Sequence, residues 1–207
     1  AVDESPLQEG LIWVGSDDGL IHLTKDGGAT WENVTPKKMP DWMMINSIDA
    51  SSFDSGTAYI AGTRYKLGDF TPYLYVTDDY GKNWKLITDG IKDEHFTRVL
   101  RSDKVNKNIL YAGTETGMYI SYDRGNSWNE FQKNLPIVPI TDLTIKDNSL
   151  IVATQGRSIW MIDDLTVIHQ LTSPTDKVKL YKPKDSYRMS GTGAVSYTHL
   201  RAHETTL

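Results

Sequence analysis

The stretch Thr24-Lys-Asp26-Gly-Gly28-Ala-Thr30-Trp31 recurs twice in the sequence, as Thr77-Asp-Asp79-Tyr-Gly81-Lys-Asn-Trp84 and as Ser121-Tyr-Asp123-Arg-Gly125-Asn-Ser127-Trp128. All three copies obey the pattern Ser/Thr-x-Asp-x-Gly-x-x-Trp. The first two aspartates are 53 residues apart and the next two are 44 apart. Blades of β-propellers repeat every 40 to 50 residues or so. The spacing therefore predicts one four-stranded sheet per repeat.

Each residue type in this motif, which we call the Asp-box, has a task in a tight turn between two strands. The Asp carboxylate accepts hydrogen bonds from backbone N–H groups of the turn, and the Ser or Thr hydroxyl closes the same network. Gly adopts a positive φ without steric cost, and Trp packs a large apolar ring on the neighbouring sheet. The order of the acids does not match a calcium loop, so we expect structural turns and no metal site.

Runs rich in β-branched and aromatic residues surround every Asp-box and predict an all-β fold. We expect a partial β-propeller of four-stranded antiparallel blades near residues 11–35, 44–88, 96–132 and 140–171. The first blade is expected to lack its inner strand, which makes about three and three-quarter blades and an incomplete N-terminal end. In the fourth blade Asp163 and Asp164 have no Gly and Trp after them, and a strand over 167–171 is expected to close the sheet.

Composition limits the possible functions of the 207 residues. The chain has 22 basic and 27 acidic residues, a net charge of −5, which argues against a nucleic-acid partner. It has no cysteine, so thiolate metal sites and disulfides are excluded. No apolar run is long enough to cross a bilayer, so membrane insertion is not expected. No cofactor motif is present.

Several segments resemble Asp-box repeat propellers of bacteria, in particular the last blades of large sortilin-like and glycoside-hydrolase-like proteins. The resemblance extends from about Asn46 to Gln170 and rests on segments such as Leu110-Tyr-Ala-Gly-Thr-Glu-Thr-Gly117 and Ala153-Thr-Gln-Gly-Arg-Ser-Ile-Trp160. It implies an exported protein in the periplasm, at the cell surface or secreted. Such families include sialidases, xyloglucan-cleaving enzymes and non-catalytic receptors. Gln155 stands where the family pattern has His, which argues against a role that needs an imidazole there.

The C-terminal part is expected to differ from the propeller at 1–172. Residues 173–193 resemble the linker that follows such propellers. Residues 194–207 include Val195-Ser-Tyr-Thr-His-Leu-Arg-Ala-His-Glu-Thr205, which resembles a translated adapter found on unrelated metagenomic proteins. We therefore expect a non-native tail. Its His199 and His203 do not have the His-Glu-x-x-His order of a zinc motif.

Loops that join the second and third strands of each blade lie on the face opposite the Asp-boxes, and we expect a ligand there. The longest, Thr63 to Pro72, offers Arg64, Tyr65, Asp69 and Phe70 for sugar stacking or a protein contact, or its aromatic residues cover the edge of the sheet. The other candidates for ligand binding on this face are Arg98, Glu115, Gln155 and Arg157.

Three arginines from successive blades, Arg64, Arg98 and Arg157, would bind a carboxylate if they converged, whereas pairing with nearby acids is the structural alternative. Asp17 and Glu115 occupy equivalent loops and are candidates for acid and base catalysis of glycoside cleavage. The sequence leaves three functions open: a module that binds glycan or protein ligands, part of a glycoside hydrolase with most catalytic residues in missing blades of the same polypeptide, or an architectural sector. Enzymatic activity is therefore undecided.

Overall fold

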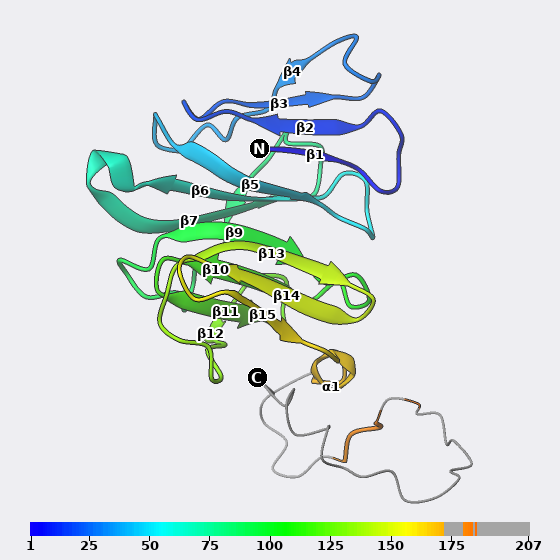
Figure 1. The fold of residues 1–207 in the computed structure, drawn as a ribbon. Helices are drawn as coiled ribbons and strands as arrows, with labels where there is room; N and C mark the ends of the chain where they lie inside the picture. The colour runs from blue at the N-terminus through cyan, green and yellow to red at the C-terminus, as the bar shows by residue number, and fades with distance from the viewer. Residues whose placement is uncertain (172–179, 184, 186–207) are drawn as a thin grey trace, which may run out of the picture.

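The computed structural model describes residues 1–171, 180–183 and 185, and these form four antiparallel sheets side by side (Figure 1). The expected linker over 173–193 lies mostly, and the tail over 194–207 entirely, outside the described residues. The first sheet contains β1 (Val2–Glu4), β2 (Ile12–Gly15), β3 (Ile21–Thr24) and β4 (Glu32–Asn33). The second contains β5 (Met44–Ala50), β6 (Ala58–Arg64), β7 (Asp69–Thr77) and β8 (Lys85–Leu86), with the 3-10 helix η1 (Tyr65–Leu67) between β6 and β7.

The third sheet contains β9 (Thr97–Ser102), β10 (Leu110–Thr114), β11 (Gly117–Ser121) and β12 (Asn129–Glu130). The fourth has three strands, β13 (Ile140–Lys146), β14 (Ser149–Thr154) and β15 (Ile159–Ile162), followed by the helix α1 (Thr166–His169). Strands within each sheet follow chain order, with the first strand innermost and only antiparallel neighbours. This is the partial β-propeller that the repeats predict. None of the helices in the described part has the length and apolar character of a membrane span.

An apolar core fills each of the three joints between neighbouring sheets. The middle sheets are covered on both faces, so every residue of β10 and of β11 is buried. Trp13 and Ile60 belong to the core between the first and second sheets, and Leu100 and Trp128 to that between the second and third. Tyr111 and Leu143 belong to the last one. Burial on both sides explains why these strands are continuous apolar runs and do not alternate with polar residues.

The three Asp-boxes fold into the same turn. In the third, the Ser121 hydroxyl donates to Asp123 at 2.8 Å and accepts the N–H of Gly125 at 2.8 Å, while Asp123 accepts the N–H of Ser127 at 2.9 Å. The corresponding bonds in the other two boxes, from Thr24 to Thr30 and from Thr77 to Asn83, are 2.7 to 2.9 Å long. One carboxylate and one hydroxyl group within each box thus close the turn.

The Trp of an Asp-box fastens its sheet to the preceding one. Trp84 donates its indole N–H to the carbonyl of Val34 at 2.7 Å, and Trp128 donates to that of Ile87 at 2.7 Å. The box glycines, Gly81 and Gly125, have φ of 80° and 83°, and a Cβ on either would lie 2.6 Å from the side chain of Val34 or Ile87. Glycine is therefore required there both for the turn and for close approach of the two sheets.

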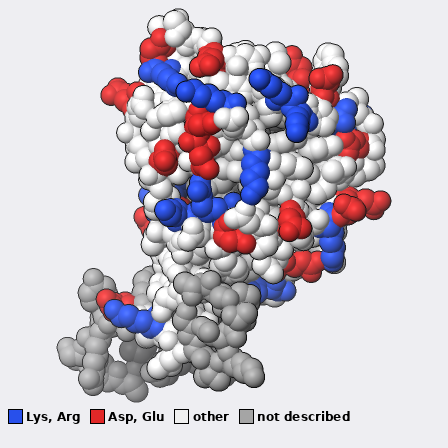
Figure 2. All heavy atoms as spheres, turned by 180° about the vertical axis from the view of Figure 1, so that it is seen from behind, with Lys and Arg blue, Asp and Glu red and all other residues white. Residues whose placement is uncertain are grey.

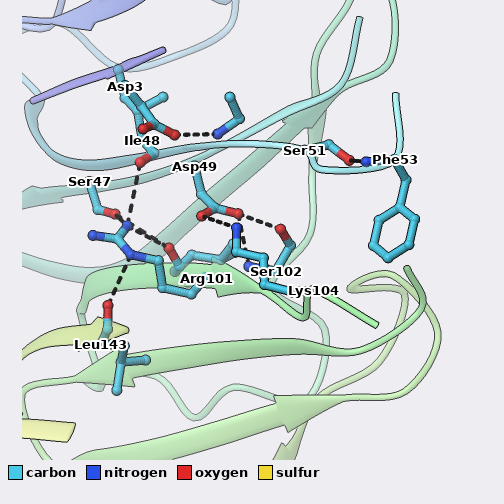
Figure 3. A network of polar contacts seen from close by, with 12 residues as sticks. Asp3, Ser47, Ile48, Asp49, Ser51, Phe53, Arg101, Ser102, Lys104 and Leu143 are labelled. Carbon is cyan, nitrogen blue, oxygen red and sulfur yellow. Dashed lines mark hydrogen bonds and ion pairs between the residues drawn. The ribbon is translucent and has the colours of Figure 1, made fainter. Parts of the chain in front are cut away.

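A second set of contacts joins the inner strands (Figure 3). Asp3 of β1 accepts the backbone N–H of Ala50 in β5 at 2.7 Å, and Asp49 of β5 accepts that of Ser102 in β9 at 2.9 Å. Arg101 of β9 continues the series by donating to the carbonyl of Leu143 in β13 at 3.0 Å. These side chains bridge consecutive sheets close to the propeller axis.

Three expectations about the edges of the sheets are wrong. The first sheet does have its inner strand, because Val2–Glu4 pairs in register with Ile12–Val14. The fourth sheet lacks the outer strand expected over 167–171, because Thr166–His169 forms the helix α1 after a turn in which Asp164 accepts the N–H of Thr166 at 2.9 Å. The long loop over 63–72 is mostly strand, since β6 and β7 extend to Arg64 and from Asp69.

Two tryptophans at the same motif position should respond very differently to truncation. Trp128 is 4% exposed and bonded to the second sheet, whereas Trp31 is 47% exposed. We expect Trp128→Ala to lower the free energy of unfolding by about 3 to 5 kcal/mol. Trp31→Ala should cost about 1 kcal/mol or less. Chemical denaturation of both variants measures the difference, and equal losses would contradict the docking role of Trp128.

The contribution of the first Asp-box to stability should depend on pH. Hydrogen bonds from the Thr30 hydroxyl, the Thr30 N–H and the Thr24 hydroxyl lower the pKa of Asp26 from 3.8 to about 2. A carboxyl group whose pKa is lowered in the folded state stabilises the fold above pH 3.8. This contribution disappears as the pH falls towards 2. We therefore expect Asp26→Asn to be less stable than the wild type at neutral pH. Between pH 3.8 and 2 the variant should lose less stability than the wild type. Denaturation curves across this pH range test it, and an unchanged pH slope refutes it.

Candidate functional site

Two kinds of connection lie at the end of the sheets opposite the Asp-boxes. One joins the second and third strands of a sheet, and the other joins one sheet to the next. We call this end the loop face; it carries η1 and lies on the left of Figure 1. A hollow of about 280 Å³ opens here between the first and second sheets. It is lined by Asp17, Asp18, Trp42, Met44, Thr63, Arg64, Tyr65, Lys66 and Leu67. The hollow combines an indole ring, two carboxylates and two cationic side chains.

Arg64 fixes one wall of the hollow. Its Nη1 donates to Asp69 at 2.8 Å, and its Nε donates to the carbonyl of Asp41 at 3.1 Å. Burial alone would raise the pKa of Asp69, but hydrogen bonds from Thr71, Tyr73 and Arg64 outweigh it and lower that pKa. Asp69 therefore stays ionised, and Arg64 ties the turn of the second sheet to the segment that enters β5.

Trp42 is the most exposed aromatic side chain at the hollow, at 69%. Its φ of 59° is unusual for a bulky residue, and the backbone just before it is held by Arg64 through the Asp41 carbonyl. The sequence analysis missed Trp42 as a candidate. A signal was available, because this Trp lies outside the Asp-box pattern, in a polar segment between two sheets.

Asp17 and Asp18 form the opposite wall, in the loop between β2 and β3. The Ser16 hydroxyl donates to Asp18, which lowers the pKa of Asp18. Asp17, a candidate for catalysis, is exposed on the same wall. Glu115, the other catalytic candidate, does not line this hollow. The two carboxylates that the sequence suggests as a catalytic pair therefore do not line the same hollow.

The remaining aromatic candidates form a ridge between the second and third sheets. Tyr65 stacks on Phe96 with ring centroids 5.3 Å apart, and Phe70 lies 6.0 Å from the same ring. The guanidinium of Arg98 lies 5.3 Å from the centre of Phe96. Phe96 is buried, whereas Phe70 is 47% exposed. Tyr65 and Phe70 therefore pack against Phe96, which precedes β9, and Phe70 remains partly open to solvent.

The three candidate arginines lie in different surroundings. Arg64 pairs with Asp69 and Arg98 with Glu115, each an acid of its own sheet. Arg157 and Gln155 are exposed in the turn between β14 and β15 of the fourth sheet. Only Arg64 lines the hollow. Across residues 1–171, 180–183 and 185, no three His, Cys, Asp or Glu side chains gather as a metal site requires.

Acidic and basic side chains are interspersed over the side of the molecule seen in Figure 2. Ion pairs account for part of this mixing, for example Arg124 with Asp78 at 2.6 Å. A surface of this kind lacks the continuous positive field that attracts a phosphate backbone.

Solved structures with a similar fold come from unrelated settings. YCF48, in a structure titled as bound to D1 peptide, is 19% identical, with a TM-score of 0.57 over 77% of this chain and 54% of that one. The GH74 xyloglucanase from Xanthomonas campestris is 16% identical, with a TM-score of 0.60 over 79% and 28%. A chain of the COPII outer coat vertex on membranes is 12% identical, with a TM-score of 0.62 over 78% and 45%.

These identities show a shared fold and nothing more specific. This chain spans about half or less of the length of the three chains compared. No curated protein matches the sequence significantly.

A family model does match. Residues 72–186, more than half of the chain, fit the Sortilin-Vps10 model, whose description reads sortilin, neurotensin receptor 3. The matched residues include the second and third Asp-boxes and the strands of the third and fourth sheets. With four sheets arranged as propeller blades, this chain belongs to the Sortilin-Vps10 family.

Proposed function

We propose that this propeller sector binds a ligand in the hollow between the first and second sheets. The observation that carries the proposal is Trp42, an indole 69% exposed beside Asp17 and Asp18. Leaving so large an apolar surface in water has no benefit for the fold, whereas a flat ring beside polar anchors suits a ligand. The Arg64 bridge limits the freedom of the segment before Trp42, which lowers the entropic cost of binding.

A glycan is the first candidate ligand. The apolar face of a sugar ring fits on the indole of Trp42, and the carboxylates of Asp17 and Asp18 accept hydrogen bonds from hydroxyl groups. A GH74 xyloglucanase is among the similar folds, which supports this class of ligand. Lys66, on the opposite wall, offers a donor for further hydroxyl groups.

A peptide is the second candidate, because the two aspartates beside an indole also suit a Lys or Arg side chain. A cation over the ring of Trp42 and paired with Asp17 would gain both a cation–π and an ionic contact. The YCF48 structure with its D1 peptide is a similar fold that supports this alternative. An extracellular or surface location suits both candidates and forms part of the proposal, on the strength of the family match.

Hydrolysis of a glycoside is less well supported by the described residues. Glycosidases need two carboxyl groups across one cleft. Asp17 faces the hollow, but Glu115 is paired with Arg98 elsewhere on the loop face. Hydrolysis would then depend on acids from further blades of a longer polypeptide.

Further sheets of the same polypeptide also form part of the proposal. Trp84 and Trp128 each bond to a preceding sheet, whereas Trp31 is 47% exposed on the outer side of the first sheet. A sheet next to the first one would cover Trp31 in the same way. Exposed Ile159 and Met161 on β15 mark the other end of the array, where a neighbouring sheet would also bury apolar surface.

Binding of glycans and peptides to immobilised protein tests the proposal, with Trp42→Ala as the main variant. We expect loss of the indole to weaken the best ligand about tenfold or more, as central aromatic contacts usually do. Arg64→Ala should weaken it as well, because Asp41 and the backbone before Trp42 lose their support.

Leu86→Ala is the matched control, since Leu86 is 49% exposed on β8, away from the hollow. It should bind like the wild type. The proposal fails if neither a glycan nor a peptide binds, or if Trp42→Ala binds as tightly as the control. A glycan or a peptide as the best ligand decides between the two candidates.

A further inference from the structure

A second repeat lies at the opposite end of the sheets, in the loops between first and second strands. It comprises Ser5-Pro-Leu-Gln-Glu-Gly-Leu11, Ser51-Ser-Phe-Asp-Ser-Gly-Thr57 and Asp103-Lys-Val-Asn-Lys-Asn-Ile109. Each loop closes with one backbone bond from its first N–H to its last carbonyl, 2.8 to 3.0 Å long. The first side chain of each loop also accepts the N–H of the third residue, at 3.3, 3.1 and 2.7 Å.

The third residue of every loop is a large apolar side chain exposed to solvent. Leu7 is 51% exposed, Phe53 42% and Val105 65%. Figure 3 shows Phe53 beyond the polar contacts of Ser51, outside the network of the inner strands. The fold gains nothing from apolar groups at three equivalent exposed positions, since the loops are closed by polar groups. We call the three residues the apolar row.

The apolar row stands on a rigid base. The bonds from Asp3 to Ala50 and from Asp49 to Ser102 join the inner strands directly before the loops begin. Consecutive sheets are therefore fixed side by side at the end where the row lies. A preformed surface loses little conformational entropy when it docks, which favours association.

Charge changes sign along the row. The first loop carries Glu9, and Glu4 lies just before it, whereas the third loop carries Lys104 and Lys107. All four side chains are exposed. Lys104 lies 3.8 Å from Asp49, whereas Glu9 and Lys107 have no ion pair with any residue that the structure describes. The middle loop carries exposed Phe53 and Asp54 between these two ends. A surface with an acidic first loop and a basic third loop on either side of Phe53 is complementary to itself after a half-turn.

We propose that the apolar row is an interface between two copies of this chain, related by a twofold axis near Phe53. Leu7 of each copy then faces Val105 of the other, and the acidic first loop faces the basic third loop. The two Asp54 side chains approach near the axis, a repulsion that the exposed position and salt screen. The two loop faces point away from each other, so the dimer presents two ligand sites and gains avidity for repetitive ligands.

Sedimentation equilibrium of the 207-residue chain tests the proposal. We expect a species of twice the 23.3 kDa chain mass that dissociates on dilution. Phe53→Asp should shift the chain to monomer, and Asp54→Asn should strengthen the dimer by removing the repulsion at the axis. Ile137→Asp is the matched control, because Ile137 is 79% exposed but lies on the loop face, and it should leave association unchanged. Thermal unfolding confirms that all variants fold.

Exchanging the charges of Glu9 and Lys107 distinguishes this interface from a nonspecific apolar contact. Lys107→Glu and Glu9→Lys should each weaken the dimer, because each places like charges against one another across the twofold axis. The double variant restores opposite charges and should recover the dissociation constant of the wild type. A wild-type chain that stays monomeric at its highest soluble concentration overturns the proposal, as does a dimer that Phe53→Asp leaves intact. If the chain is monomeric but still binds a ligand, the proposed function holds and the proposed dimer does not.

Discussion

Side chains of the inner strands reach across from one sheet to the backbone of the next, and the arrangement of the molecule depends on them. Asp49, 4% exposed, accepts both the N–H and the hydroxyl of Ser102, and Asp3 makes the corresponding bond to Ala50. A buried carboxylate without such donors would cost several kcal/mol. Neighbouring sheets are therefore held in one register at the axis, while the Asp-box tryptophans hold them at the periphery.

Both proposed surfaces follow from the fixed spacing of the sheets. The hollow exists because the first and second sheets bring Asp17, Trp42 and Arg64 together from three different connections. The apolar row exists because three equivalent loops leave the axis side by side. The same joints thus position the hollow at one end of the sheets and the apolar row at the other.

The sequence was sufficient for the repeat, the turns and the sheet order, because the Asp-box carries its own hydrogen-bond partners within seven residues. The sequence was insufficient where a strand pairs with residues outside its own motif. Ala1-Val-Asp-Glu4 has no alternating pattern and becomes a strand only because β2 offers its edge. The apolar residues over 167–171 suggested a strand, but Thr166–His169 is a helix that buries Ile168.

The candidate site was predictable as a face and not as a set of residues. Arg64, Tyr65 and Asp69 lie at the turn between β6 and β7, as the sequence suggests, yet their partners, the Asp41 carbonyl and Phe96, come from other connections. Trp42 lies in a segment without a periodic hydrophobic pattern, so the sequence does not reveal that its side chain is exposed. The convergence of Arg64, Arg98 and Arg157 could not be judged from sequence, since it depends on which nearby acid each guanidinium meets.

Hydrogen exchange of the Ser102 amide measures the central joint most directly. If Asp49 fastens the second sheet to the third, this N–H exchanges only through global unfolding, and Asp49→Ala accelerates its exchange more than that of amides inside β10. A Ser102 amide that exchanges as fast as those of the exposed loops would contradict the account, because the sheets would then lack their bond at the axis.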